Sequence, residues 1–166
     1  MGKKTVSKST TRSKKSPKVK AKIVPVSDEH IPVYQTAGSA CADLVAHVTG
    51  EVGNRVSLPS RRVTKIDTGI RVQVPEGYKL CVSARSGLAS RGVIVTNAPG
   101  QVDSDYRGRV MVIVANCGNQ IVNIENGQRF AQCWIEPVYK FDWEVISEDE
   151  LEETDRGEGG FGSTGD

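Results

Sequence analysis

Two carboxylates and an arginine lie close together in the stretch Asp103-Ser104-Asp105-Tyr106-Arg107-Gly108. On an extended strand, Asp103 and Asp105 point to one side and Tyr106 points to the other. A carboxylate in such a place can act as a general base toward water, or it can anchor a metal ion indirectly. A turn acid beside an arginine is also often a solvated ion pair, so this stretch alone leaves both interpretations open.

A second polar stretch, residues 85–92, has the composition of an anion-binding site. Arg85 supplies a forked donor, Ser86 supplies a hydroxyl, and Gly87 lets backbone N–H groups approach a ligand closely. A helix that begins near Ser86 adds its free N–H groups to this attraction. A capped helical turn beside a surface arginine explains the same residues without a ligand.

A third polar group, Gln132, lies in a strand that we expect to begin near residue 127. Alternation along a strand predicts two faces: Arg129, Ala131 and Cys133 on one, and Phe130, Gln132 and Trp134 on the other. Because Gln132 then lies among bulky apolar side chains, its amide needs a hydrogen-bond partner. That partner is either the backbone or a ligand.

The glycine-rich end, residues 156–165, contains four side chains that suit a nucleotide: Arg156, Phe161, Ser163 and Thr164. Glycines let backbone N–H groups surround a phosphate, the hydroxyls donate hydrogen bonds, and an aromatic ring offers a flat face to a base. The run lacks the lysine that follows a Walker A loop, which argues against a P-loop ATPase. We expect a mobile tail that closes over a nucleotide; a frayed terminus is the alternative.

Short strands are the elements that must position these groups. Between about residues 22 and 140, Val and Ile recur with a period of two, as in 72–74, 109–114 and 121–124. Turn signals recur about every ten residues, for example at 75–77, 98–100, 117–119 and 125–127. No long helical pattern competes with them. The pattern predicts an all-β antiparallel sandwich, barrel or jelly roll.

Length and composition suit one domain. The chain has 166 residues, of which 37% are hydrophobic, and it contains no apolar run long enough to span a membrane. It also lacks the apolar run of a secretory signal, so we expect a soluble, non-secreted protein. Two histidines, His30 and His47, argue against a multi-histidine metal site. The four cysteines are far apart, and we expect them to be reduced and buried.

The charges are distributed unevenly along the chain. Residues 1–22 carry nine Lys or Arg and no acid, which leaves 13 basic residues against 20 acidic ones in the rest. We expect a disordered basic arm (1–22), a β domain (23–141), and an acidic linker with a glycine-rich end (142–166). The arm suits nucleic acid, an acidic partner or a nuclear import signal; a solvated arm without a partner is the alternative.

Taken together and in order, five stretches resemble the five motifs of the homotrimeric deoxyuridine triphosphate nucleotidohydrolases, or dUTPases. The first motif is Ala37-Gly38-Ser39-Ala40-Cys41-Ala42-Asp43-Leu44. The other four are the stretches described above, in chain order 85–92, 97–108, 127–132 and 156–165. The resemblance covers residues 22–165 and implies a jelly-roll-like β barrel. Two departures from the family pattern are Cys41-Ala42 before Asp43 and Gln101 two residues before Asp103.

The resemblance also implies an activity: Mg²⁺-assisted hydrolysis of dUTP to dUMP and pyrophosphate, which limits uracil in DNA and supplies dUMP for dTTP synthesis. Asp103 would activate the water that attacks the α-phosphorus, and Asp43 would hold Mg²⁺ through its bound waters. The implied substrate contacts are Arg85, Ser86, Gly87 and Gln132 on the phosphates, Asn97, Gly100, Val102 and Tyr106 around uracil and deoxyribose, and Arg156, Phe161, Gly162, Ser163 and Thr164 on the tail. The uracil contacts would lie on a β-hairpin running from Asn97 to Val102.

The family assembles as trimers whose sites combine residues of several subunits. By resemblance, the partners of this chain are therefore dUTP and two further copies, with a nucleic acid or an acidic partner for the basic arm and no membrane. The expected location is the cytoplasm, or the nucleus in a eukaryote. Two rival hypotheses stand: a dCTP deaminase of the same fold, and a nucleic-acid-binding or regulatory protein that uses the arm.

Overall fold

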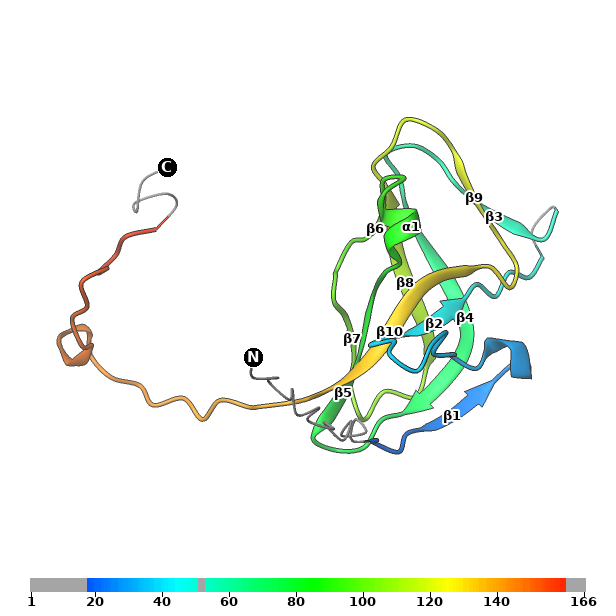
Figure 1. Ribbon diagram of the computed structural model, residues 1–166. Helices are drawn as coiled ribbons and strands as arrows, with labels where there is room; N and C mark the ends of the chain where they lie inside the picture. The colour runs from blue at the N-terminus through cyan, green and yellow to red at the C-terminus, as the bar shows by residue number, and fades with distance from the viewer. Residues whose placement is uncertain (1–17, 51–52, 161–166) are drawn as a thin grey trace, which may run out of the picture.

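Antiparallel strands form almost the whole of the domain in the computed structural model, which describes residues 18–50 and 53–160 (Figure 1). One four-stranded sheet has the order β1-β4-β8-β6 and the other the order β2-β10-β5-β7. A small two-stranded sheet pairs β3 with β9. The predicted all-β class is therefore confirmed, and the arrangement is a jelly-roll-like barrel.

The strands have the following bounds: β1 Lys22–Pro25, β2 Ala42–Val45, β3 Arg55–Leu58, β4 Val63–Gln73, β5 Tyr78–Ala84, β6 Val93–Val95, β7 Gly100–Val102, β8 Arg109–Asn116, β9 Val122–Glu125 and β10 Arg129–Pro137. The helical elements are single turns: η1 Asp28–His30, α1 Ser86–Ala89 and η2 Glu148–Glu150. None of the helices in the described ranges is long and apolar enough to cross a membrane.

The core lies between the two large sheets and is built by the alternation that the sequence predicts. Val110, Val112 and Val114 of β8 are buried, whereas Met111 between them is exposed. On the facing sheet, Leu44 of β2 and Ala131 of β10 are completely buried. Branched aliphatic side chains on one face of each strand therefore hold the two sheets together.

The cysteines are reduced, and three of the four avoid solvent. Cys81 and Cys133 are buried, as expected, whereas Cys41 is only half-buried. Cys117 is exposed, contrary to the expectation that all four are buried. It lies just after β8, in a turn where Gly118 approaches Gly92, so the side chain points to solvent.

The chain leaves the domain after β10 and continues away from the two sheets (Figure 1). Of residues 138–160, only η2 is regular. The acidic side chains of this segment are exposed. Most of the basic arm, residues 1–17, lies outside the described part of the chain, whereas Lys22 begins β1.

Candidate functional site

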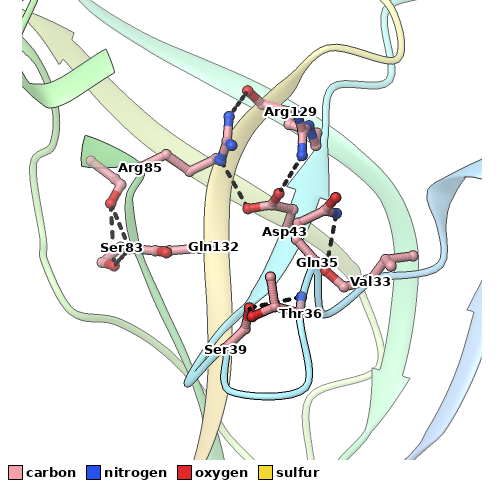
Figure 2. Close-up of polar contacts among 10 residues, drawn as sticks. Val33, Gln35, Thr36, Ser39, Asp43, Ser83, Arg85, Arg129 and Gln132 are labelled. Carbon is pink, nitrogen blue, oxygen red and sulfur yellow. Dashed lines mark hydrogen bonds and ion pairs between the residues drawn. The ribbon is translucent and has the colours of Figure 1, made fainter. Parts of the chain in front are cut away.

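Two arginines hold the carboxylate of Asp43 (Figure 2). Arg85 donates from Nε to Oδ1 of Asp43 at 2.8 Å, and Arg129 donates from Nη1 to Oδ2 at 3.1 Å. The Asp43 side chain is only 10% exposed, so the two ion pairs offset the cost of removing its charge from water. The guanidinium groups leave one positive charge in excess, which suits an anionic ligand.

Three strands bring this cluster together from distant parts of the chain. Asp43 lies on β2 opposite Gln132 of β10, and Gln132 lies opposite Ser83 of β5. Arg85 follows β5 directly and precedes the helical turn α1, so its side chain reaches across β10 to Asp43. The sheet order β2-β10-β5 therefore brings together the family motifs that contain Asp43, Arg85 and Gln132.

The helical turn expected near Ser86 is present and spans Ser86–Ala89. The backbone N–H groups of Leu88 and Ala89 both donate to the carbonyl of Arg85. The N–H groups of Ser86 and Gly87 come before the first intrahelical bond, as at any helix start. Both residues are exposed, so these N–H groups and the Ser86 hydroxyl lie on the accessible side of the cluster.

Gln132 finds its partner in the backbone. Its Nε2 donates to the carbonyl of Ala84 at 3.0 Å and to Oγ of Ser83 at 3.3 Å. The structure thus shows a backbone partner for this amide, and a ligand partner stays a prediction. Half-buried between Ser83 and Asp43, Gln132 still lies at the same surface as Arg85 (Figure 2).

Arg129 is a member of the cluster that the sequence analysis missed. Strict alternation puts its side chain on the face opposite Gln132, but the register of β10 against β2 shifts between Arg129 and Ala131. This β-bulge lets Phe130 and Ala131 both enter the core, where they are 2% and 0% exposed. Arg129 consequently reaches the side of Asp43, a common effect of bulges beside functional sites. No local sequence pattern predicts this register shift, because the shift depends on how β10 pairs with β2.

The stretch that contains Asp103 is a turn and not the strand that would align its two carboxylates. The backbone N–H of Tyr106 donates to the carbonyl of Asp103 at 3.2 Å, which closes the turn after β7. Asp103 is exposed and lines an open depression of about 940 Å³ with Ser104, Asp105 and Lys79, among other residues. Asp103 is therefore accessible to water and to a ligand.

Tyr106 is fixed above a glycine. Its hydroxyl donates to the carbonyl of Arg109 at 3.0 Å. A Cβ placed on Gly108 would overlap the Tyr106 ring. The ring is 45% exposed, so it offers a flat apolar surface beside Asp103.

The segment from Asn97 to Val102 differs from the hairpin implied by the resemblance. β6 pairs with β8 and β7 pairs with β5, so the chain crosses from one sheet to the other. The connection is a tight turn with a cis peptide bond between Ala98 and Pro99. Asn97 is exposed at this turn, Val102 is half-buried and Gly100 is buried.

Asp103 and Arg85 lie at opposite ends of β5. The register pairs Leu80 with Val102 and Val82 with Gly100, which puts Asp103 beyond Leu80, level with Lys79. Residues 79 and 85 are about 20 Å apart along an extended strand at roughly 3.3 Å per residue. One copy of the chain therefore brings Asp43, Arg85 and Gln132 together but leaves Asp103 and Tyr106 at a distance.

The tail residues are only partly described. Arg156 is exposed, and its Nε donates to the carbonyl of Gly159 at 2.7 Å within the same turn. Phe161, Gly162, Ser163 and Thr164 lie outside the described residues.

The residues fit a magnesium ion that arrives with phosphate better than one held by protein alone. Within 18–50 and 53–160, no three His, Cys, Asp or Glu side chains gather in a way that would hold a metal ion. Burial raises the pKa of the Cys133 thiol, behind Asp43, to about 12, so this thiol stays protonated. The single carboxylate of Asp43 suits Mg²⁺, which keeps several waters and takes further ligands from phosphates.

Comparison with known proteins agrees with this architecture. The dUTPase family model matches residues 27–165. The deoxyuridine 5'-triphosphate nucleotidohydrolase of Roseobacter denitrificans is 44% identical over 141 residues, covering 81% of this chain and 86% of that protein. The corresponding protein of Chlamydia pneumoniae is 45% identical over 136 residues, covering 81% and 90%.

Solved structures share the fold. A Staphylococcus bacteriophage 80alpha dUTPase with dUpNHpp has a TM-score of 0.73 and 23% identity over 88% of this chain and 98% of that one. A Streptococcus mutans dUTPase has a TM-score of 0.65 and 22% identity over 74% and 98%. The family model and the two curated relatives together show that the protein is a hydrolase of nucleotide metabolism. The chain belongs to the dUTPase family, as its sequence predicts.

Proposed function

We propose that this protein hydrolyses dUTP to dUMP and pyrophosphate. The observation that carries the proposal is the Asp43–Arg85–Gln132 cluster, a phosphate-binding surface built on the motifs that mark the family. In a cell, this reaction would limit uracil incorporation into DNA and supply dUMP for dTTP synthesis.

Arg85 and Ser86 bind the triphosphate, and Gln132 joins them when its amide turns from Ser83 and the carbonyl of Ala84 toward the phosphates. Arg85 has five N–H donors and uses one on Asp43 and one on the carbonyl of Arg129, so the others are free for phosphate oxygens. The exposed N–H groups of Ser86 and Gly87 add donors of fixed orientation. Donors arranged in advance around a phosphate chain stabilise the charge that shifts toward the leaving pyrophosphate.

Asp43 would hold the magnesium ion that accompanies the nucleotide. Each of its carboxylate oxygens accepts one hydrogen bond from an arginine and keeps a lone pair for a water of the ion's shell. When bound, Mg²⁺ would offset the negative charge of the triphosphate and so favour attack by a nucleophile.

Asp103 activates the water. Its carboxylate takes a proton as the water oxygen bonds to the α-phosphorus, and the bond from that phosphorus to the bridging oxygen breaks to release pyrophosphate. Tyr106, fixed over Gly108, packs against deoxyribose and leaves no room for a 2′-hydroxyl. The turn from Asn97 through Gly100 to Val102 receives uracil through its backbone and the Asn97 amide, a pattern that rejects cytosine.

Completion of the site requires further copies of the chain. The separation of about 20 Å between the ends of β5 prevents Asp103 of one copy from reaching a nucleotide held by Arg85 of the same copy. In a closed trimer, a neighbouring copy supplies Asp103 and Tyr106. The segment that follows β10 also favours an assembly, because large apolar side chains that are exposed in one chain can be buried against another. Four alternate residues of this segment are 80–96% exposed in the isolated chain: Tyr139, Phe141, Trp143 and Val145.

The tail closes the site. Arg156, Ser163 and Thr164 bind the γ-phosphate end, Gly162 allows close approach of the backbone, and Phe161 stacks on uracil. Closure would exclude bulk water and align the triphosphate with the attacking water. The tail should therefore affect kcat as well as KM.

The test is hydrolysis of a nucleotide panel. Purified protein is incubated with Mg²⁺ and dUTP, dTTP, dCTP or UTP, and the products are identified. We expect dUMP and pyrophosphate from dUTP alone, and a loss of at least about 10²-fold in the Asp103→Asn variant. Ammonia from dCTP would favour the deaminase alternative, and equal hydrolysis of dUTP and UTP would contradict the proposed site.

A further inference from the structure

We infer that Arg129 is a positioning residue that, together with Arg85, fixes the orientation of the Asp43 carboxylate toward the nucleotide-bound metal ion. The consequence for metal binding rests on the proposed function, whereas the orientation of Asp43 can be tested without a nucleotide. Neither the sequence motifs nor the expected substrate contacts give the Arg129 side chain a role.

The geometry requires two donors to fix one carboxylate. Arg85 holds Oδ1 at 2.8 Å and Arg129 holds Oδ2 at 3.1 Å. The terminal torsion of an aspartate is broad, so one donor on one oxygen leaves the plane of the carboxylate free to turn. Two donors from different elements, one on each oxygen, determine the plane and therefore where the remaining lone pairs point.

The β-bulge in β10 lies next to Arg129, where it turns this side chain toward Asp43. Without the register shift, Arg129 would point to the opposite face and Phe130 would point to the side of Asp43. The shift instead buries Phe130 to 2% exposure and turns the arginine toward Asp43. The local fold of β10 is thus built to place this guanidinium group.

Replacement of the Arg129 side chain isolates its contact with Asp43. The backbone carbonyl of Arg129 accepts a hydrogen bond from Nη1 of Arg85 at 3.1 Å, and this contact survives any substitution of the side chain. The Arg129 side chain is 47% exposed, so its removal should disturb the fold little. Groups that orient metal-binding carboxylates typically change metal affinity or activity by about 10–100-fold when mutated.

The first experiment uses the free protein. In NMR spectra, we expect the Arg85 Nε–H to exchange with solvent faster in Arg129→Met than in the wild type, with Arg129→Lys in between. The control is Arg109→Met, which removes a longer ion pair, 3.7 Å to Asp67, elsewhere in the domain. Unchanged exchange in Arg129→Met would overturn the inference whether or not the protein hydrolyses dUTP.

The second experiment is a double-mutant cycle on metal binding. The affinity for Mn²⁺ is measured by electron paramagnetic resonance in the presence of dUpNHpp for Arg129→Met, Asp43→Asn and the double variant. We expect Arg129→Met to weaken Mn²⁺ binding about 10–100-fold alone and less than about twofold in the Asp43→Asn background. Arg129→Lys should recover part of the loss, and Arg109→Met should match the wild type.

Two outcomes of the cycle contradict the inference. Additive effects would show that Arg129 does not act through Asp43. A large loss of dUpNHpp affinity in Arg129→Met without metal would show that Arg129 binds phosphate directly. Failure of the wild-type protein to bind dUpNHpp would instead contradict the proposed function, and the exchange experiment on the free protein would still decide the role of Arg129.

Discussion

Two inactive variants should restore each other's activity when they assemble together. Asp103→Asn removes the proposed general base, and Arg85→Gln removes the proposed principal phosphate donor. Each variant alone should be nearly inactive. The two residues lie at opposite ends of β5, about 20 Å apart along the strand. A site made from two copies can therefore take an intact Asp103 from one variant and an intact Arg85 from the other.

The recovered fraction follows from the assembly. In a closed ring with one direction of contact, a site is intact when the copy supplying Asp103 is the Arg85→Gln variant and the copy supplying Arg85 is the Asp103→Asn variant. At equal mixing, chance gives about one quarter of the wild-type activity per site. At other mixing ratios, the activity should follow the product of the fractions of the two variants. It should fall to zero when only one variant is present.

The assay combines the two variants by co-refolding and measures pyrophosphate release from dUTP. Mixing of the already folded proteins without exchange is the control and should give no recovery. A mixture that stays inactive at every ratio, although mass spectrometry shows mixed assemblies, would refute the shared site. So would full activity of either variant alone.

Three further predictions concern the scaffold and the sugar pocket. Gly69→Ala should lower the free energy of unfolding by about 2–4 kcal/mol in chemical denaturation, because Gly69 has φ +72° and an added Cβ would overlap the His30 ring; little change would contradict the packing described. Burial, and then the neighbouring His47, lowers the pKa of His30, so stability due to neutral His30 is present above about pH 6.5 and is lost as the pH falls. The thermal midpoint should therefore fall less between pH 8 and pH 5.5 in His30→Phe than in the wild type, and parallel curves would disprove this role. Gly108→Ala should displace the Tyr106 ring, raise KM for dUTP about tenfold or more and weaken the discrimination against UTP, as measured by steady-state kinetics; unchanged kinetics would remove Tyr106 from the pocket.

Local patterns sufficed to predict some of the strands, namely the end of β4, β8, β9 and β10, and the helical turn. The alternation of Val and Ile marks β8, where alternate residues are buried, and the glycine after Ser86 marks α1. The cluster of Asp43, Arg85 and Gln132 was expected from the family motifs, which the resemblance assigns to one site. Sequence reasoning is strongest where a single strand or a short motif contains the whole signal.

Features that depend on pairing between distant strands were not predictable in this way. The bulge that turns Arg129 toward Asp43 arises from the register between β10 and β2, which no local pattern encodes. The separation of Asp103 from Arg85 follows from the order β10-β5-β7, which the sequence alone does not reveal. At Asp103 the sequence left a strand and a turn both open, and the structure shows the turn, which Ser and Asp residues favour through their local hydrogen bonds.

Hydrolysis in water enriched with ¹⁸O tests the central claim most directly, because the label records which phosphorus atom the water attacks. Products of a single turnover of dUTP with Mg²⁺ are analysed by mass spectrometry. Attack of an Asp103-activated water on the α-phosphorus predicts one ¹⁸O atom in dUMP and none in pyrophosphate. Label in pyrophosphate, or unlabelled dUMP from complete turnover, would contradict the account.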